Sequence, residues 1–272
     1  MPWRLSGKKK LNIFSGKQNL SVQATLFNFL KNTFNPSNSF TLPQVDMHAH
    51  LLPGIDDGAV SLEDSIAMIE RLCALGFTHL VATPHIYKEF YPNNSATILE
   101  KLKLVRQELT RRGINIRLDA AAEYFMDDHF ESLLQNDDIL TLPGGFVLVE
   151  MSFVAEQPNF RQVLFDMQIK GYKPILAHPE RYPYLNQNMQ GIQNLVDGGC
   201  RLQINLLSLL GHYGKRAQLS AEKMIKLNLV SMVGTDAHNI QHIDQLSILI
   251  RSSTIRRLIV NYDFENNKLS NF

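Results

Sequence analysis

The sequence predicts an α/β fold in which parallel strands alternate with helices and close into a barrel. From residue 45 onward, short apolar or β-branched runs alternate with segments of helical periodicity. The links between them are short, which is typical of βα units with parallel strands. Seven strand candidates favour a closed (β/α)7 barrel over an open sheet, and 272 residues are enough for one such domain.

The strand candidates share a high content of apolar and β-branched residues and are bounded by turn-forming or polar residues. Seven of them follow one another along the chain: Val45–His48, His79–Thr83, Ile116–Ala121, Phe146–Met151, Pro174–His178, Arg201–Asn205 and Leu229–Thr235. Because each is followed by a helical segment, the strands are expected to run in the same direction.

The helical segments repeat apolar residues at intervals of three and four. They are Leu62–Leu75, Ser95–Arg112, Asp128–Gln135, Asn159–Lys170, Asn188–Val196, Ser220–Lys226 and Ile240–Arg251. Ser61 followed by Asp64 can cap the first helix. Glycines that favour helix ends follow several of the others, at Gly76, Gly113, Gly171 and Gly198.

Charge is distributed unevenly. The chain has 27 basic and 26 acidic residues, but residues 1–44 hold six basic residues and no acidic one. The remainder therefore carries 21 − 26 = −5, which argues against wholesale nucleic-acid binding. Apolar runs are far shorter than the roughly 20 residues that a membrane helix needs, so the chain is not expected to span a membrane.

Residues 1–44 are predicted to form a basic, loosely ordered leader ahead of a barrel domain at residues 45–272. This segment lacks the apolar core and cleavage site of a secretory signal. A segment that docks on a partner or on a membrane surface is an alternative, and so is an organellar transit peptide.

Ionisable residues gather at the ends of the predicted strands. Six of the seven strands have histidine, aspartate or glutamate at or just after their ends, and the loop after the first strand adds Asp57. The set comprises His48, His50, Asp57, His85, Glu123, Glu150, His178, Asp236 and His238. Imidazole and carboxylate groups bind divalent metal ions, and nine of them exceed the needs of a single tetrahedral ion. The sequence therefore predicts a cluster of two or three metal ions.

Longer motifs carry a resemblance to a known family. Three phrases are involved: His-x-His-Leu-Leu-Pro-Gly-Ile-Asp-Asp-Gly at 48–58, Ala-His-Pro-Glu-Arg at 177–181 and Gly-Thr-Asp-Ala-His at 234–238. Together with Thr83-Pro84-His85, Glu123 and Glu150, they resemble the polymerase and histidinol phosphatase (PHP) superfamily. More narrowly, they are similar to the bacterial metal-dependent tyrosine-protein phosphatases of capsule and exopolysaccharide systems.

The resemblance implies a distorted (β/α)7 barrel, the PHP fold, with three divalent ions. Manganese is the usual metal, and iron, zinc or cobalt can replace it. By position, two adjacent ions would be held by His48, His50, Glu123, Glu150, His178 and Asp236. The third would be held by Asp57, His85, Glu123 and His238, with Glu123 shared. Arg181 matches the arginine that binds the substrate phosphate.

One departure from the family pattern concerns the second positive group near the substrate. Members often carry a further arginine shortly after the last Asp-x-His, but here Asn239-Ile240-Gln241-His242 follows His238. Lys88 is the candidate that could replace it, and Tyr213 is a candidate for contact with the substrate ring.

The implied activity is hydrolysis of phosphotyrosine on a membrane-anchored bacterial tyrosine kinase that controls polysaccharide export, by a cytoplasmic enzyme. Hydrolysis of histidinol phosphate or another small phosphomonoester is the alternative. No lysine stands at a strand end, which argues against amidohydrolase chemistry, and the full ligand set argues against a silent regulatory domain. The positions six residues after Cys73 and Cys200 hold His79 and Leu206 rather than arginine, which excludes a cysteine phosphatase loop. Both thiols are expected to be reduced.

Overall fold

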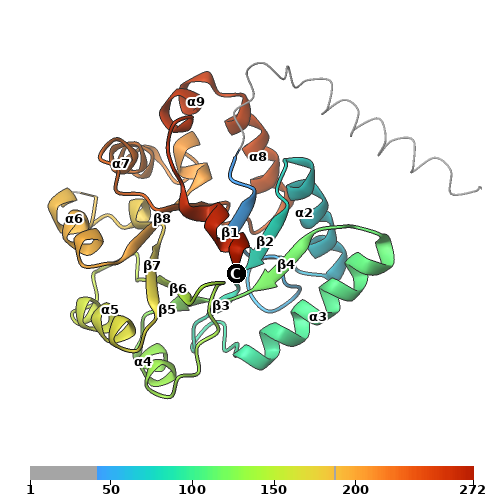
Figure 1. The fold of residues 1–272 in the computed structure, drawn as a ribbon, viewed down its shortest axis with the longest axis horizontal. Coiled ribbons are helices and arrows are strands. Elements are labelled where there is room, and N and C mark those ends of the chain that lie inside the picture. Colours follow the sequence, from blue (N-terminus) through green and yellow to red (C-terminus); the bar gives the residue numbers. More distant parts are fainter. Residues whose placement is uncertain (1–41, 187) are drawn as a thin grey trace, which may run out of the picture. The chain divides into compact units, whose positions relative to one another are not determined.

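The computed structural model describes residues 42–186 and 188–272, so the prediction for the leader falls almost wholly outside it. In the described part, strands alternate with helices, and the helices lie outside the strands (Figure 1). Every strand pair in the two sheets is parallel. The predicted α/β class with parallel strands is confirmed.

The strands belong to two sheets. The smaller sheet has the order β1 (Val45–Ala49), β2 (His79–Ala82) and β4 (Arg117–Ala120). The larger has the order β3 (His85–Ile86), β5 (Glu123–Phe125), β6 (Phe146–Glu150), β7 (Lys173–Ala177), β8 (Arg201–Asn205) and β9 (Met232–Gly234). Each of the seven predicted strands is therefore present, and two further short strands that were not predicted, β3 and β5, follow the second and third of them in the larger sheet.

The change from one sheet to the other occurs where the chain passes from β2 to β3 and from β4 to β5. Pro84 stands between the first pair, and proline has no N–H with which to continue a ladder. Its carbonyl still accepts a hydrogen bond from the N–H of Glu123 (3.1 Å). The passage thereby places His85 and Glu123 in the same sheet as β6.

The first and last strands lie side by side. The N–H of His50 donates to the carbonyl of Ala237 (3.0 Å), and the N–H of Asp236 donates to the carbonyl of His48 (2.8 Å). These bonds bring the carboxyl ends of β1 and β9 together although almost two hundred residues separate them. Polar residues that follow the first and the last strand thus meet at one place.

Seven helices match the predicted ones: α2 (Leu62–Ala74), α3 (Ser95–Arg112), α4 (Asp128–Gln135), α5 (Phe160–Ile169), α6 (Met189–Asp197), α7 (Lys215–Lys226) and α8 (Ile240–Arg251). Ser61 and Asp64 form the predicted capping box at the start of α2. The start of α7 was predicted too late, at Ser220, because its first turn begins with two charged residues and shows no apolar periodicity.

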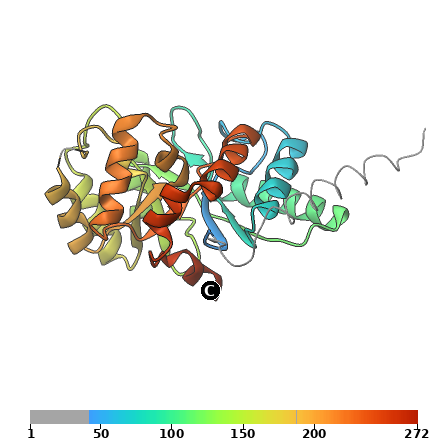
Figure 2. The ribbon, with the colours of Figure 1, turned by 90° about the horizontal axis from the view of Figure 1, so that it is seen from above.

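Four short helical elements were not predicted: η2 (Pro179–Arg181), η3 (Leu206–Leu210), α9 (Ser253–Ile259) and η4 (Glu265–Asn271). The last of them lies at the amino ends of the strands, at the centre of the view in Figure 1 and below the sheets in Figure 2. Asn266 bonds the carbonyls of Val45 (3.0 Å) and Val233 (2.7 Å), and Leu269 is fully buried among residues of both sheets. This end is thereby closed, and the carboxyl ends of the strands remain for the site.

Two further expectations concern the described residues. Cys73 and Cys200 are free thiols, as predicted. Within residues 42–186 and 188–272, no helix combines the length and the apolar character needed to cross a membrane.

Candidate metal centre

All nine predicted ligands lie at the carboxyl ends of the strands. A cavity of about 430 Å³ opens there, and seven of the nine line it, together with Arg181 and Tyr213. The other two, His48 and His50, are fully buried. Side chains from both sheets therefore meet at one cavity.

The ligand atoms form four overlapping groups, in each of which they lie within 4.8 Å of one another. Two groups lie around His48 and two around His85, and Glu123 belongs to one of each. The groups are His50, Asp57, His85 and His238; His48, His50 and Asp236; His48, Glu123 and His178; and His85, Glu123 and Glu150. Imidazole and carboxylate donors in this number suit several divalent ions of borderline or hard character.

A hydrogen bond at Nδ1 orients three of the histidines. In each, Nδ1 faces an oxygen acceptor, which fixes the proton on Nδ1 and leaves the Nε2 lone pair free. The pairs are His48 Nδ1 with Gln203 Oε1 (2.9 Å), His50 Nδ1 with Asp56 Oδ2 (2.8 Å), and His238 Nδ1 with the carbonyl of Asp236 (2.9 Å). A ligating histidine is normally held in this way.

The freed nitrogens face one another. His48 Nε2 lies 3.4 Å from His50 Nε2 and 3.2 Å from Glu123 Oε2. Two lone pairs this close require a cation or a proton between them. In the metal-free protein, burial lowers the pKa of His48, but the carboxylates of Glu123 and Asp236 outweigh burial and raise it to about 9. The protein thus holds a proton where a metal ion would place its charge.

Two residues of the cluster have unusual backbone conformations. His178 has φ of 35° and Asp236 has φ of 50°, in the left-handed region that is costly for residues other than glycine. Both follow the last residues of a strand, where the chain turns sharply. Such strain persists where the surrounding contacts impose it, and here it is found at two residues of the cluster.

Two glycines in the motifs permit close packing against His48 and His50. A Cβ on Gly58 would lie 2.3 Å from the carbonyl oxygen of His50, and a Cβ on Gly234 would lie 2.7 Å from the Cβ of His48. Any side chain at either position would displace backbone or a buried ring. The glycines of the 48–58 and 234–238 phrases thus have a direct role in seating the two histidines.

Arg181 is held over the same cavity by aromatic rings. Its guanidinium carbon lies 4.6 Å from the ring centre of Phe153 and 4.3 Å from that of Tyr213. Nη1 donates to Asp236 Oδ2 (3.1 Å). Burial lowers the pKa of Arg181, but Asp236 and other anionic neighbours raise it overall, so the group stays charged. A flat, charged fork in this position can bind two phosphoryl oxygens at once.

The structure places the other substrate-binding candidates differently. Tyr213 lines the cavity, but Lys88 is exposed in the turn between Tyr87 and Tyr91 and is not among the lining residues. A role for Lys88 in substrate binding stays a prediction. Tyr91 lines the cavity instead, and its ring stacks on that of His85 with centres 5.2 Å apart.

Sequence reasoning left His242 out of the site, although its side chain lines the cavity. It lies in the first turn of α8, with ring centres 5.9 Å from His238 and 4.9 Å from His212. The available signal was its position four residues after His238, in the first turn of the helix predicted at Ile240–Arg251.

The sequence also did not single out the groups that orient the ligands. Asp56 and Gln203 hold two histidines, and Asn205 Nδ2 donates to Asp236 Oδ2 (2.6 Å). Gln203 and Asn205 occupy alternate positions of β8, the one predicted strand without a candidate ligand at its end. Two buried amides in a strand of otherwise apolar burial were the signal that could have found them.

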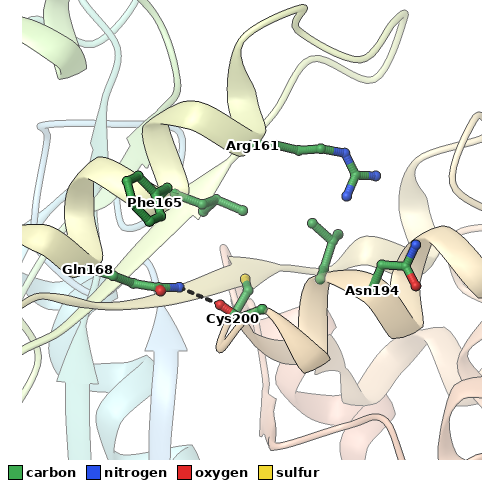
Figure 3. A pocket seen from close by; sticks show the side chains of 8 residues that line it. Arg161, Phe165, Gln168, Asn194 and Cys200 are labelled. Carbon is green, nitrogen blue, oxygen red and sulfur yellow. Dashed lines mark hydrogen bonds between the residues drawn. The ribbon is translucent and has the colours of Figure 1, made fainter.

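A second cavity, of about 210 Å³, lies between α5 and α6 and contains Cys200 (Figure 3). It holds no histidine or carboxylate, and the amide of Gln168 donates to the carbonyl of Gly198 (2.8 Å). Burial raises the pKa of Cys200 to about 12, so the thiol is protonated at neutral pH. This supports the exclusion of a cysteine nucleophile.

Comparison with known proteins identifies the family. A profile of the family described as capsular polysaccharide synthesis, CpsB/CapC, matches residues 44–245. The chain belongs to this family. It is 31% identical over 198 residues to the tyrosine-protein phosphatase YwqE of Bacillus subtilis, covering 72% of this chain and 78% of that one. The resemblance drawn from the motifs is therefore confirmed.

Two solved structures are similar to the described fold. One comes from the crystal structures of YwqE from Bacillus subtilis and CpsB from Streptococcus pneumoniae, described as unique metal-dependent tyrosine phosphatases. It matches with a TM-score of 0.71 and 29% identity over 79% of this chain and 89% of that chain. The other is the histidinol phosphate phosphatase of Lactococcus lactis in complex with zinc, L-histidinol and phosphate, with a TM-score of 0.51. At 15% identity over 78% of this chain and 94% of that one, it shows the fold alone.

Proposed function

We propose that this protein is a metal-dependent protein-tyrosine phosphatase that hydrolyses phosphotyrosine monoesters. The observation that carries the proposal is a nine-residue cluster of imidazole and carboxylate groups that shares its cavity with a stacked, charged arginine. The names of its relatives support the same reaction. The enzyme is a phosphoric monoester hydrolase.

The two sheets together make a distorted (β/α)7 barrel of the PHP type, which with its helices forms one domain at residues 45–272. Support comes from the hydrogen bonds between the ends of β1 and β9, and from the ladder that runs through β3, β5 and β6. The distortion arises where β2 and β4 give way to β3 and β5. β2 and β4 belong to the smaller sheet, and β3 and β5 belong to the larger one.

The proposed cofactor is three manganese ions, with iron, zinc or cobalt as substitutes. His48, His50, Glu123, Glu150, His178 and Asp236 would hold two of them. Asp57, His85, Glu123 and His238 would hold the third. The oriented Nε2 atoms of His48 and His50 support this assignment, because their Nδ1 atoms are already used. Bound divalent ions supply an activated water and neutralise charge on the phosphoryl oxygens.

The chain's own residues bind and orient the substrate phosphate. Arg181 presents its fork to the phosphoryl oxygens, and the rings of Phe153 and Tyr213 keep the guanidinium plane fixed. Tyr91, on the wall of the same cavity, offers an aromatic face to the substrate ring. Phenolate is a weakly basic leaving group, so departure of the tyrosine needs no strong general acid.

The natural substrate is a phosphotyrosine protein, and a membrane-anchored bacterial tyrosine kinase that controls capsule or exopolysaccharide synthesis fits best. The family's description as capsular polysaccharide synthesis supports this choice. The enzyme works in the cytoplasm, and the basic leader can hold it near an anionic membrane surface. Deletion of residues 1–40 should then lower recovery in the membrane fraction, and unchanged recovery would refute that role.

The test of the reaction is phosphate release after metal removal and restoration with manganese. A phosphotyrosine peptide, a phosphoserine peptide and histidinol phosphate are compared. Release confined to the phosphotyrosine peptide supports the proposal. Release only from histidinol phosphate would keep the fold and metal cluster but replace the substrate. Inactivity on all three with metal bound would refute the substrate class.

Arg181→Ala separates the roles of arginine and metal. We expect a loss in kcat/KM of about a hundredfold or more, with bound metal unchanged, because Arg181 is not among the ligands. Arg161→Ala is the matched control, since Arg161 lines the cavity between α5 and α6. Full activity of Arg181→Ala would remove this residue from the site.

A further inference from the structure

A groove of about 300 Å³ lies between α7 and the segment that follows η2. We call it the α7 groove, and it is lined by Pro183, Asn186, Arg216, Leu219, Ser220 and Lys223. None of these residues lines the catalytic cavity. In α7, Leu219 and Ser220 each lie three or four positions from both Arg216 and Lys223, so the four residues share one face of the helix.

Two buried polar atoms of the α7 groove lack a partner. Within the described residues, neither Ser220 Oγ nor Asn186 Oδ1 forms a hydrogen bond, and Ser220 is only 5% exposed. Buried polar groups are normally satisfied, so each of these two atoms has unused hydrogen-bonding capacity in a residue that lines the groove. A half-turn of the Asn186 amide exchanges its oxygen for an NH₂ donor. The groove then offers two donors to an acceptor-rich ligand.

The α7 groove is also positively charged. Arg216 and Lys223 are exposed at its sides, and none of the ion pairs found in the described part of the chain involves them. By contrast, Lys226 on the same helix pairs with Glu222 (3.8 Å). No acidic side chain lines the groove. Two unpaired cations above two uncharged donors match the oxygens of a phosphate dianion.

The apolar part of the lining indicates what carries that phosphate. Leu219 is 51% exposed, and Pro183 is exposed on the opposite wall. These two side chains can cover the faces of an aromatic ring. Phosphoserine has a short side chain without a ring and would not fill this space. The combination of donors, cations and apolar walls is suited to phosphotyrosine.

Each wall of the α7 groove is joined to a residue of the catalytic cavity. Asn186 follows Arg181 by five residues, and Arg216 follows Tyr213 by three. An extended chain spans at most about 3.5 Å per residue, so these separations cannot exceed roughly 18 Å and 11 Å. A bound peptide can cover such distances in three to five residues.

We propose that the α7 groove binds a second phosphotyrosine of the same substrate chain, three to five residues away from the one being hydrolysed. This rests on the proposed phosphatase function. Binding at two linked places raises the affinity for a multiply phosphorylated segment without any change in the catalytic cavity. The enzyme therefore prefers tyrosine clusters that carry several phosphates.

The test uses peptides with a non-hydrolysable phosphonate analogue of phosphotyrosine. One peptide carries a single analogue, and three others carry a second one three, four or five residues away. Each is titrated by fluorescence anisotropy into the manganese-loaded, full-length protein. We expect at least one doubly substituted peptide to bind about tenfold more tightly than the single one. The double variant Arg216→Ala/Lys223→Ala should reduce this ratio to about one.

Lys226→Ala/Arg251→Ala is the matched control, because it removes the same charge from exposed positions outside the α7 groove and should keep the ratio. Equal binding of all peptides, or a ratio unchanged in the groove variant, overturns the proposal. If inorganic phosphate alone shifts the amide resonances of the groove and the peptides bind equally, the groove holds a free anion and the proposal is also overturned.

Turnover of a singly phosphorylated peptide distinguishes this proposal from the proposed function. If turnover is normal and the doubly and singly substituted peptides bind equally, the second binding place in the α7 groove is refuted and the phosphatase function is retained. Absence of turnover with the tenfold ratio retained refutes the phosphatase activity and leaves a phosphotyrosine-binding groove.

Discussion

Removal of the Asp56 carboxylate tests whether its hydrogen bonds set the metal centre. Asp56 Oδ2 accepts from His50 Nδ1 (2.8 Å) and from the N–H of His85 (3.3 Å), and Oδ1 accepts from the N–H of Gly58 (3.0 Å). Its side chain and that of His50 are fully buried. Asp56→Ala therefore removes the group that fixes the His50 tautomer.

The size of the effect follows from these contacts. A hydrogen bond to a charged group contributes about 1.5–3 kcal/mol, and two backbone donors would also lose their partner. We expect the metal-free protein to lose roughly 2–4 kcal/mol of unfolding free energy. Loss of a residue that orients a ligand typically weakens metal binding by about 10- to 100-fold, or about 1.4–2.8 kcal/mol. Asp56→Asn keeps an acceptor for His50 and should lose less than about tenfold.

Manganese affinity is measured by competition with a chromophoric chelator, and stability by chemical unfolding of the metal-free protein. Asp64→Ala is the control: it breaks the exposed capping box of α2 at a cost of about 1 kcal/mol and does not touch the metal centre. If Asp56→Ala binds manganese as the wild type does, the reasoning on tautomer control is wrong. If Asp64→Ala weakens metal binding equally, the effect reflects stability alone.

Three further predictions concern neighbouring features. Gly58→Ala should weaken manganese binding at least about tenfold in the same titration, because its Cβ would lie 2.3 Å from the His50 carbonyl; wild-type affinity would contradict this. Because the pKa of His48 is raised to about 9, the protonated His48 side chain stabilises the metal-free fold fully below pH 6.5. This stabilisation is lost as the pH rises through 9. Metal affinity should accordingly increase from pH 6.5 to 9 with proton release in calorimetry, and binding without release would refute it. Leu269→Ala should lower the free energy of unfolding in denaturant by about 3 kcal/mol and leave metal affinity unchanged. A loss of metal affinity would contradict this and show that η4 helps to hold the metal centre in place.

The sequence predicted the regular elements well where local signals were strong. Ser95–Arg112 is bounded by Asn94, which caps its first turn, and by Gly113 in a left-handed conformation, and its predicted limits hold to the residue. The short strands β3 and β5, which follow the second and third predicted strands, were missed. Whether such a short segment forms a strand depends on the neighbouring strand with which it pairs, and a single chain segment does not encode its partner.

The short elements near the carboxyl terminus were missed for a related reason. The seven residues of η4 have too little periodicity to predict a helix, and their position is set by the bonds of Asn266 to β1 and β9. His242 was missed because it does not follow a predicted strand. It lines the cavity because α8 begins beside the cavity.

By itself, the sequence indicated the chemistry of this protein: nine candidate metal-binding side chains, each at or near a strand end, and the motifs of the capsular polysaccharide synthesis family. The sequence could indicate that these side chains lie together, because alternating strands and helices place the carboxyl ends of all the strands on the same side of the sheets. Only the tertiary structure decided which groups orient those ligands and which rings hold Arg181. Asp56, Gln203 and Phe153 acquire these roles through contacts between segments distant in the chain or through loop geometry, and neither leaves a periodic signal in the sequence.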